Sequence, residues 1–592
     1  MIILRGKPAV AGIGIGKARF LRRSTRIVSA NIVRGEEREQ VKRLEEAVRR
    51  TRTELTDIKN EIKEKIGDDH ALILESQLLL LEDKKLIEEM ISRIVENLET
   101  AEKAIESLIK KYHGIFQNVE DYHIKEKVHD IEDVLRRIQK NLGKEEVEES
   151  WEGGVLVSKN ILPSEAAFII SKKSPEGIVT EYGGDTYHAV ILARAFGIPT
   201  VVGIEDVEKK IKEGEEVIVD GNEGKVILSP TSIQISNYRN LKLTLQEEEK
   251  VFMKALEEES TTLDGEEFEL YVNLEFPTES EKVPAEKIDG VGLFRSEYLL
   301  LSSFRIPDEE HQIQVYSALA DRFKEVTIRL FDLGAEKRVE GLPFYDEENP
   351  ALGERGIRYL FSNKELLYTQ LRAILRTSAT HPNLRIMVPM VTSMDEIKKL
   401  YLVLEDVMEN LRMEGQKFRE EIPVGIMVEV PSIAISIDKI VRHVDFISIG
   451  TNDLSQYMFA ADRTNERVSY ICNPLDPSFL RLLKFIIKKT RDAGKRVSVC
   501  GEMASNPLHA AVLLGLGLKE FSSTPAMLPR IKRALISLEY SVMKRKATNA
   551  LRFSTAQEVE EYMLKELEKI YPDIYRCIRR LYYEKDRKTM GI

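Results

Sequence analysis

The sequence has few cysteines, no long apolar run and no excess of positive charge, and each of these lacks excludes a class of protein. Three cysteines lie far apart among 592 residues, which gives neither a disulfide framework nor a zinc site and predicts a reducing cytoplasm. No apolar run approaches the roughly 20 residues that a membrane span needs, and the N-terminus lacks the apolar core of a signal peptide. The net charge of −11 argues against a nucleic-acid binder.

A glycine-rich stretch near the N-terminus, Gly12–Lys17, does not match a phosphate-binding loop. That loop needs four residues between its first glycine and its Gly-Lys pair, followed by Ser or Thr. Ala11 and Ala18 stand at the two ends instead, so a strand and a turn are expected there. A chain of this length should contain three or four domains, each with its own core.

Charged helix extends from about Gly35 to Lys144. Apolar residues recur there on heptad spacing, and Thr51 takes the one polar position of the seam. The apolar positions are Val41, Leu44, Val48, Leu55, Ile58 and Ile62. With the later amphipathic segments this pattern predicts an up-and-down set of about four helices. The helices alone leave open whether the bundle is a scaffold or a docking site for a partner.

The segment 150–232 returns to short strands and contains a histidine in an unusual setting. Two glycines end a strand-like run, the capping residue Thr186 follows, and His188 leads into a helix that Gly197 ends. Free backbone N–H groups and the helix dipole favour an anion at such a turn. His188 is therefore a candidate phosphoryl acceptor, and a capping or packing role is the alternative. A polar helical connector follows at 235–259.

From about residue 265 strands and helices alternate. Eight strands with intervening helices over about 300 residues predict a (β/α)₈ barrel. The expected strands are Glu269–Leu274, Gly290–Phe294, Val326–Phe331, Leu384–Pro389, Val424–Val428, Phe446–Gly450, Arg496–Val499 and Glu520–Ser522. Such barrels carry their chemistry at the carboxyl ends of the strands. Polar residues occur at those ends: Arg295, Arg329, Asp332, Glu429, Asn452, Asp453 and Cys500.

These residue types suit a substrate rich in carboxylate and phosphate oxygens. A guanidinium group binds such anions through two contacts at a time. Glu429 and Asp453 are hard oxygen ligands appropriate to Mg²⁺, which usually keeps substrate oxygens and waters as its other ligands. Cys500 is placed to act as an acid or as a nucleophile. For each residue taken singly, an ion pair or a small buried side chain at the barrel rim is the competing explanation.

An ordered set of motifs carries a family resemblance over nearly the whole chain. The motifs are Gly183–Arg194, Gly290–Glu297, Arg329–Lys337, Glu348–Arg358, Met427–Pro431, Ser448–Tyr457, Asp462–Arg463 and Cys500–Glu502. Through them the chain resembles enzyme I of the bacterial phosphoenolpyruvate-dependent sugar phosphotransferase system. The resemblance implies a multidomain α/β protein. Its parts would be a swivelling phosphohistidine domain (1–20 and 146–232), an inserted helical bundle (21–145), a linker helix (233–262) and a C-terminal (β/α)₈ barrel (263–592).

By the same resemblance, His188 takes the phosphoryl group of phosphoenolpyruvate and passes it to a histidine of the phosphocarrier HPr, the first step of sugar phosphotransferase transport. Glu429 and Asp453 would ligate Mg²⁺, and Cys500 would protonate the departing enolate to give pyruvate. The helical insert would dock HPr, and the barrel would form a homodimer. The substrate would be held by Arg295, Arg329, Arg355, Asn452 and Arg463.

The chain departs from the family pattern at several positions. Asp185 and Tyr187 replace the usual Arg and Ser of the histidine loop, and Gln77 replaces a frequent His in the helical insert. Ala335 stands where the family has the second Gly of Asp-x-Gly-Gly. The tail beyond about Lys565 is longer than usual and includes a basic stretch at 579–588.

Two other readings compete with this one. Phosphoenolpyruvate synthase and pyruvate phosphate dikinase share both modules, but they need a nucleotide-binding domain of several hundred residues, for which nothing in this sequence serves. A regulatory, nitrogen-type paralogue of enzyme I with an altered histidine loop is the second alternative. Damage in the barrel would be its distinguishing mark, and every barrel residue named above is present.

Overall fold

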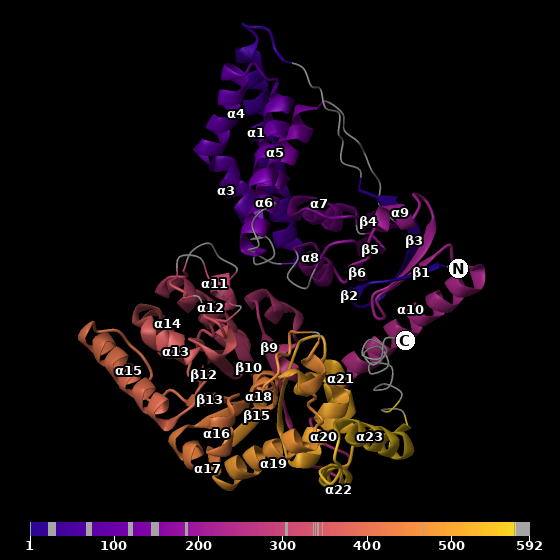
Figure 1. Cartoon of the computed structure of the whole chain (residues 1–592). Coiled ribbons are helices and arrows are strands. Elements are labelled where there is room, and N and C mark those ends of the chain that lie inside the picture. The colour runs from indigo at the N-terminus through magenta and orange to yellow at the C-terminus, as the bar shows by residue number, and fades with distance from the viewer. Residues whose placement is uncertain are drawn as a thin grey trace. The chain divides into compact units, whose positions relative to one another are not determined.

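The computed structural model contains two compact units, residues 1–246 and 247–592 (Figure 1). It describes residues 2–21, 31–66, 74–116, 122–143, 153–173, 175–183, 188–301, 306–335, 337, 339, 342–345, 347–465, 467–572 and 575. No helix within these ranges is both long enough and apolar enough to cross a membrane.

The first unit is built on an eight-stranded mixed sheet in the order β1-β8-β7-β3-β4-β5-β6-β2. Its strands are β1 (Ile2–Arg5), β2 (Lys7–Val10), β3 (Ile13–Phe20), β4 (Gly154–Ser158), β5 (Gly177–Thr180), β6 (Thr200–Val202), β7 (Glu216–Asp220) and β8 (Lys225–Leu228). Strand β3 pairs in parallel with β4 and antiparallel with β7. The sequence prediction that the first 20 residues join this sheet, as strand and not as phosphate loop, is therefore confirmed.

The connection between β3 and β4 is the helical insert. Its helices are α1 (Glu37–Ile66), α3 (Glu75–Glu82), α4 (Lys84–Glu96), α5 (Ala101–Phe116) and α6 (Tyr122–Leu142). Thr51, the polar position of the predicted seam, is fully buried in α1. Its hydroxyl donates to the carbonyl of Ala47 (2.8 Å) and accepts from Nδ2 of Asn141 in α6 (3.0 Å). The one polar seam position is thus satisfied by a partner on the facing helix.

The remaining helices of this unit are α7 (Pro163–Lys173), α8 (His188–Phe196) and α9 (Val207–Lys210), and α10 (Ser232–Ala255) begins in this unit and ends in the second. Helix α8 ends where the sequence predicted, because Gly197 takes a φ of 67°, which favours glycine. One apolar core continues from the insert into the sheet, and it includes Leu44 and Leu135 of the insert with Ala166 of α7 and Leu156 of β4. The insert and the sheet are therefore packed together as one body.

A buried carboxylate joins the insert to α7. Both oxygens of Asp133, on α6, accept hydrogen bonds from Ser164 at the start of α7, one from its N–H (2.8 Å) and one from its hydroxyl (2.6 Å). Arg137 donates to the same hydroxyl (3.0 Å) and lies 3.4 Å from a carboxylate oxygen of Glu54. Burial, and then the charge of Glu165, raises the pKa of Asp133 to about 7.

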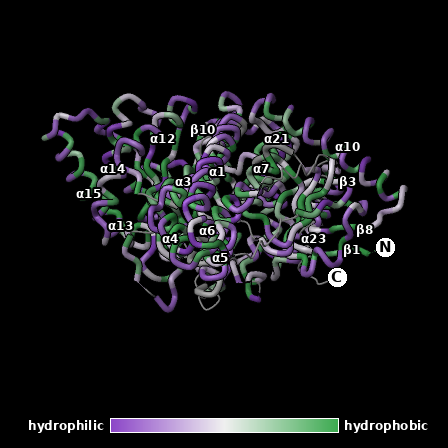
Figure 2. The backbone as a smooth tube through the Cα atoms, turned by 90° about the horizontal axis from the view of Figure 1, so that it is seen from above, coloured by the Kyte–Doolittle hydropathy of each residue, from purple (hydrophilic) through white to green (hydrophobic). Residues whose placement is uncertain are grey.

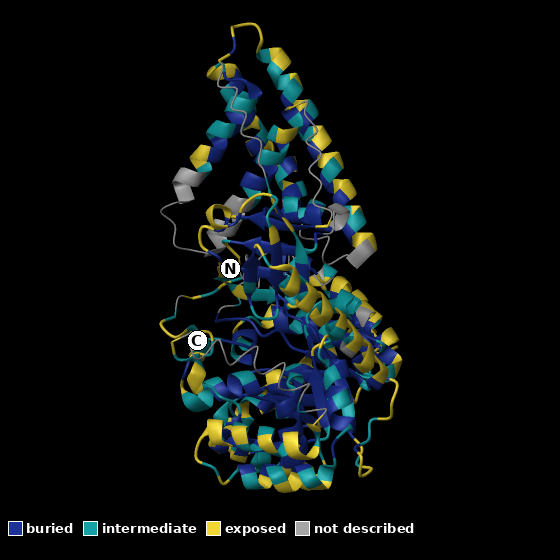
Figure 3. Ribbon diagram, turned by 90° about the vertical axis from the view of Figure 1, so that its right-hand side faces the viewer, coloured by how far each residue is buried: buried dark blue, intermediate teal, exposed yellow. Residues whose placement is uncertain are grey.

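The second unit is a closed barrel of eight parallel strands, which confirms the predicted fold class (Figure 1). The strands are β9 (Glu269–Leu274), β10 (Gly290–Arg295), β11 (Val326–Arg329), β12 (Leu384–Val388), β13 (Val424–Val428), β14 (Phe446–Ile449), β15 (Arg496–Val499) and β16 (Glu520–Ser523). The strands are buried while the surrounding helices expose their outer faces (Figure 3).

Those helices alternate polar and apolar residues along their length, as the hydropathy colouring of α15 illustrates (Figure 2). They are α11 (Tyr298–Leu301), α12 (Glu309–Arg322), α13 (Ile357–Ser362), α14 (Lys364–Ser378), α15 (Met394–Met413), α16 (Pro431–Ile435), α17 (Ile437–Ile440), α18 (Thr451–Phe459), α19 (Pro477–Asp492), α20 (Pro507–Leu516), α21 (Leu528–Ile536), α22 (Tyr540–Ala550) and α23 (Ala556–Ile570).

The two ends of the barrel differ in chemistry. At the amino ends of the strands, Arg496 contacts three acids, Glu269 (2.5 Å), Glu325 (3.0 Å) and Glu520 (3.0 Å). These ion pairs connect neighbouring strands. Residues at this end of such barrels generally contribute to stability and not to catalysis. The predicted chemical residues lie at the opposite, carboxyl end.

Candidate functional site

Six charged side chains at the carboxyl end of the barrel form one connected set, which we call the buried charge network. Its members are Glu297, Arg329, Asp332, Lys337, Arg355 and Asp453. Arg329, the last residue of β11, donates to Glu297 and lies 3.5 Å from Asp332. Lys337 reaches the same two acids at 2.9 and 3.1 Å.

Arg355 extends the network from Asp332 to Asp453. Its Nε and Nη2 donate to the two oxygens of Asp332 (3.2 and 3.1 Å). Its Nη1 and Nη2 donate to the two oxygens of Asp453 (3.3 and 3.2 Å). Such two-point pairs fix the plane of the guanidinium group. The network therefore holds Arg329 and Arg355 in set orientations, with three acids balanced by three bases.

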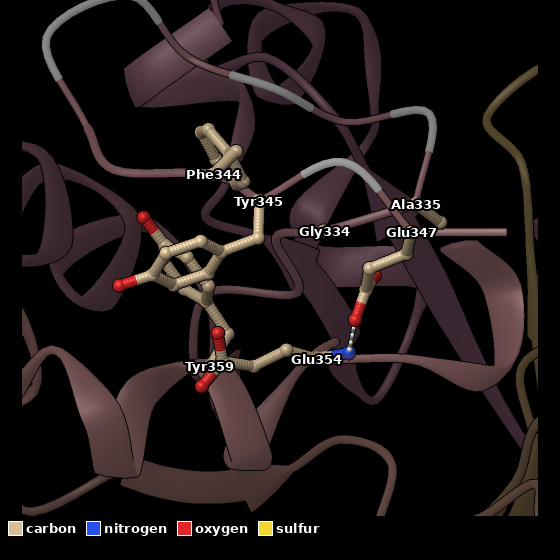
Figure 4. Close-up of a pocket in the computed structure, with 7 residues that line it drawn as sticks. All are labelled: Gly334, Ala335, Phe344, Tyr345, Glu347, Glu354 and Tyr359. Carbon is tan, nitrogen blue, oxygen red and sulfur yellow. Dashed lines mark hydrogen bonds between the residues drawn. The ribbon is translucent and has the colours of Figure 1, made fainter. Parts of the chain in front are cut away.

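Local backbone features place Arg355 in this position. Gly334 has a φ of 104°, and a side chain on it would collide with the carbonyl of Glu354. Ala335, where the family has glycine, also takes a left-handed φ of 55°, a conformation that costs a non-glycine residue about 1–2 kcal/mol. Figure 4 shows the small hollow behind this loop, where Glu347 accepts from the N–H of Glu354 (2.8 Å).

The pKa shifts in the network follow its charge balance. Burial alone would raise the pKa of Glu297, but Arg329 and Lys337 outweigh it and the pKa lies below its usual value. Lys337 and Arg355 lower the pKa of Asp332 well below its usual range in the same way, against the effect of burial. These two acids are thus held as carboxylates.

Glu429, which follows β13, is an acid of this site that forms no ion pair with any described residue. It is fully buried, and one of its oxygens accepts from the N–H of Met390 (2.7 Å). Burial, and then the charges of Asp453 and Asp332, raises its pKa to about 8. Crowded carboxylates of this kind fit a divalent cation, because the cation supplies the missing positive charge.

Glu429 and Asp453 are the two residues that would ligate Mg²⁺, and substrate oxygens and waters would complete its shell. Among the described residues no group of three or more metal-binding side chains occurs.

Arg295 and Arg329 lie side by side at the barrel mouth. They are register partners on the parallel strands β10 and β11, so both side chains leave the sheet in the same direction. Arg295 pairs with Glu275 (2.5 Å). The Nε atoms of both arginines are buried and have no hydrogen-bond acceptor within the described parts of the chain. Two adjacent cations with unused donors are suited to an anionic group of a substrate.

The other predicted substrate residues sit on the loop side of the network. Arg463 approaches Asp453 at 4.0 Å and keeps a third of its side chain exposed. Asn452, in the first turn of α18, exchanges hydrogen bonds with Glu502: its Nδ2 donates to the carboxylate (3.1 Å) and its Oδ1 accepts from the N–H (3.0 Å). Asn452 thereby joins the site to the loop that carries Cys500.

Cys500 follows β15 and lies inside the barrel mouth. It is buried in an apolar cluster with Leu293, Met387, Met427 and Phe446. Burial raises the pKa of its thiol, so the group is protonated at neutral pH. A protonated thiol in a water-poor setting is the form that can donate a proton.

His188 begins helix α8 of the first unit, as the sequence predicted. Its side chain, and the loop residues Asp185, Thr186 and Tyr187, lie outside the described residues, as does the basic stretch 579–588. Gln77, the departure in the insert, is fully buried and donates to Asp130 (2.9 Å).

The structure therefore brings Arg329, Arg355, Glu429 and Asp453 together, and it places Arg295, Asn452, Arg463 and Cys500 around them. Sequence reasoning did not assign site roles to Glu297, Lys337 or Tyr457, whose hydroxyl accepts from Arg355 (3.4 Å). Each of these three residues lies within one of the sequence motifs named above, and that position was the only sequence indication of a role in the site.

Comparisons with known proteins agree with this architecture. Sequence profiles of three families match: PEP-utilising enzyme, N-terminal (residues 5–127), PEP-utilising enzyme, mobile domain (151–224), and PEP-utilising enzyme, PEP-binding domain (249–540). The fold and the site thus define a phosphoenolpyruvate-utilising enzyme.

Individual relatives narrow this class. A phosphoenolpyruvate-protein phosphotransferase of Listeria innocua is 37% identical over 95% of this chain and 99% of its own length. Proteins of the same name from Priestia megaterium and Staphylococcus carnosus are 35% identical over 95% and 94% of this chain, and 98% and 99% of their own lengths. An Enzyme I solution structure, 31% identical, covers 41% of this chain and 99% of its own, with a TM-score of 0.33. The chain belongs to the phosphoenolpyruvate-protein phosphotransferase family.

Proposed function

We propose that this enzyme transfers the phosphoryl group of phosphoenolpyruvate to His188 and then to a histidine of the phosphocarrier HPr, in the first step of sugar phosphotransferase transport. The observation that carries the proposal is the pair Arg295 and Arg329 at the carboxyl end of the barrel, whose buried Nε donors find no acceptor among the residues that the structure describes. Phosphate and carboxylate oxygens are the acceptors that guanidinium groups bind best.

The roles of the other residues follow from their contacts. Arg355 and Arg463 flank Asp453 and add positive charge beside the transferring group. Asn452 supplies an amide at the same edge. Mg²⁺, held by Glu429 and Asp453, would neutralise phosphate charge when bound. The internal acids of the buried charge network keep the arginines oriented, so little reorganisation is needed when charge develops in the transition state.

The first transfer breaks the P–O bond of phosphoenolpyruvate and forms a P–N bond to a ring nitrogen of His188. Near neutral pH a good share of imidazole is unprotonated, so the nitrogen lone pair is available. The enolate of pyruvate leaves, and the Cys500 thiol gives its proton to the methylene carbon. The C=C electron pair forms the new C–H bond, and solvent restores the thiol proton afterwards.

His188 and the barrel residues belong to different units of the chain. The proposal therefore requires the sheet domain (1–20 and 146–232) to swivel between the barrel and the carrier. It assigns carrier docking to the insert (21–145), a linking role to 233–262, and homodimer formation to 263–592. Composition supports a cytoplasmic location, since the three cysteines are too dispersed for a disulfide framework.

Incubation with phosphoenolpyruvate and Mg²⁺, followed by intact-protein mass analysis, tests the first transfer. We expect one acid-labile phosphate on the full-length protein and none on His188→Ala. His443→Ala, an exposed histidine of the barrel unit, is the matched control and should label like the wild type. An adduct that persists in His188→Ala would sink the assignment. Labelling by ATP instead would favour the synthase-like alternative.

Addition of purified HPr to the phosphorylated protein tests the second transfer. The phosphate should move to HPr, with loss of the adduct from His188. A stable phosphoprotein that transfers to a nitrogen-type carrier and not to HPr would identify the regulatory paralogue. Sedimentation of the protein across a concentration series tests the dimer, for which a monomer at all concentrations would be the contrary result.

A further inference from the structure

Asn273 occupies an unusual position in the first strand of the barrel. It is the fifth residue of β9, and its side chain is buried with 7% of its surface exposed. A buried amide needs partners for two donors and one acceptor, or its desolvation penalty is not recovered. The hydrogen-bond partners of this amide are Cys500 itself and Ser522 of the neighbouring strand β16.

All three partner groups belong to two residues, Cys500, which follows β15, and Ser522 of β16. Nδ2 of Asn273 donates to the backbone carbonyl of Cys500 (2.9 Å) and to that of Ser522 (3.1 Å). Its Oδ1 accepts from the hydroxyl of Ser522 (2.6 Å). The amide is therefore clamped by Ser522 and holds the Cys500 peptide plane with its second N–H.

Strand β10, the neighbour of β9, leaves room for the contact between Ser522 and Asn273. A side chain at Gly292 of β10 would come within 2.4 Å of the Ser522 hydroxyl. The contact between Ser522 and Asn273 thus depends on a glycine two strands away from β16. On the other side of Cys500, a side chain at Gly501 would come within 2.0 Å of the Thr451 hydroxyl.

The Cys500 segment is consequently fixed on both sides. Asn273 holds its carbonyl, and its N–H donates to the carbonyl of Ile449 (3.2 Å). Two residues on, the N–H of Glu502 is held by Asn452 (3.0 Å). With both groups of the Cys500 backbone bonded, the direction of its Cα–Cβ bond is set, and thiol placement depends on one torsion angle.

We propose that Asn273 is a positioning residue that aims the Cys500 thiol at one face of the enolate. The inference rests on the proposed function, in which Cys500 donates the proton to the methylene carbon of enolpyruvate. Proton delivery from a fixed direction adds the proton to a single face of the planar enolate. An enolate that escapes, or a thiol that rotates, takes its proton on either face. Asn273 itself touches neither substrate nor proton.

The handedness of the product methyl group measures this directly. Phosphoenolpyruvate that carries tritium at one defined methylene position is turned over in D₂O with HPr as acceptor, and the chirality of the methyl group of pyruvate is determined. We expect wild-type enzyme to give one enantiomer and Cys500→Ala to give a racemic methyl group. Asn273→Asp keeps the shape of the side chain and the acceptor for Ser522 but has no donor for the Cys500 carbonyl.

Asn273→Asp and Asn273→Ala should both give largely racemic pyruvate. We expect kcat to fall by about 10- to 100-fold, less than the roughly 100- to 10,000-fold that a general acid contributes, because the thiol is displaced and not removed; KM for phosphoenolpyruvate should stay within about twofold. Ser522→Ala removes only the hydrogen bond from the Ser522 hydroxyl to Oδ1 of Asn273. Its product should therefore still be mostly one enantiomer. Asn383→Ala is the matched control, because Asn383 also bridges two backbone carbonyls, of Ala320 and Phe323, at the amino end of the barrel.

The outcomes distinguish failure of the positioning role of Asn273 from failure of the proposed function. Racemic product from Cys500→Ala with a single enantiomer from both Asn273 variants overturns the positioning role and leaves the proposed function standing. A single enantiomer from Cys500→Ala overturns both. Thermal stability reduced equally in Asn273→Ala and Asn383→Ala, without loss of handedness in either, would make Asn273 a purely structural residue.

Discussion

The buried acid Asp133 predicts that the first unit becomes less stable as pH rises. At low pH the side chain is protonated in both the folded and the unfolded chain. Above its ordinary pKa of 3.8 the unfolded chain loses this proton, whereas the folded chain retains it up to a pKa of about 7. The folded state then binds more protons than the unfolded state, so stability falls between these values and levels off above them.

The size of the effect follows from the pKa difference. About three units at about 1.4 kcal/mol each give a loss of about 4 kcal/mol between pH 4 and pH 8. Asp133→Asn stays neutral and carries no such pH dependence. Relative to the wild type, its free energy of unfolding should therefore rise by about 4 kcal/mol over the same pH range.

Hydrogen–deuterium exchange of peptides from α1 and α6 reports unfolding of the first unit separately from that of the barrel. Urea titrations of the full-length protein from pH 4 to pH 8 give the free energy of unfolding at each pH. Asp57→Asn, at an exposed position of α1, should shift all values equally and serves as the control. A constant difference between Asp133→Asn and the wild type at pH 5 and pH 8 would refute the reasoning.

Three further changes have defined outcomes. Thr51→Val leaves the amide of Asn141 without its buried acceptor and should lower the free energy of unfolding of the first unit by about 1–3 kcal/mol in urea titrations; an apolar residue placed at both positions should recover most of the loss. Arg329→Met removes one of the two bases that Glu297 and Asp332 share and leaves them with Lys337, so it should destabilise the barrel by about 3–5 kcal/mol in calorimetry and abolish labelling by phosphoenolpyruvate. Iodoacetamide followed by peptide mapping should modify the half-buried Cys472 well before Cys500, whose burial both shields the thiol and raises its pKa; equal rates would contradict that burial.

The barrel could be predicted from sequence because each of its strands is a local signal. Val424–Val428 is a short apolar run and Arg496–Val499 alternates polar residues with valine, and the structure reproduces their predicted bounds. Heptad spacing in α1 likewise located Thr51 at a buried position. Such patterns depend on neighbours within a few turns or one strand, so a single sequence contains them.

The connections within the site could not be predicted in this way. Arg355 contacts Asp332 and Asp453, which lie 23 and 98 residues away in the chain, and no periodicity links such positions. Asn273 gave a weak signal, a polar residue in the apolar run of residues 270–274, but its partner Cys500 is 227 residues distant. Closure of the barrel decides these pairings, and closure is a property of the whole domain.

The pairing of β3 with β4 has a consequence for the order in which the chain acquires structure. About 130 residues separate the end of β3 from the start of β4, and closing so long a flexible loop costs on the order of 4 kcal/mol in chain entropy. Strand β1 can pair only later still, because its partner is β8 at residues 225–228. During synthesis the helices of the insert, whose contacts are local, should therefore form first. Their folding reduces the length of flexible chain between the unpaired strands β3 and β4. Residues 1–20, which are synthesised before the rest of this unit, would be among the last of its residues to pair.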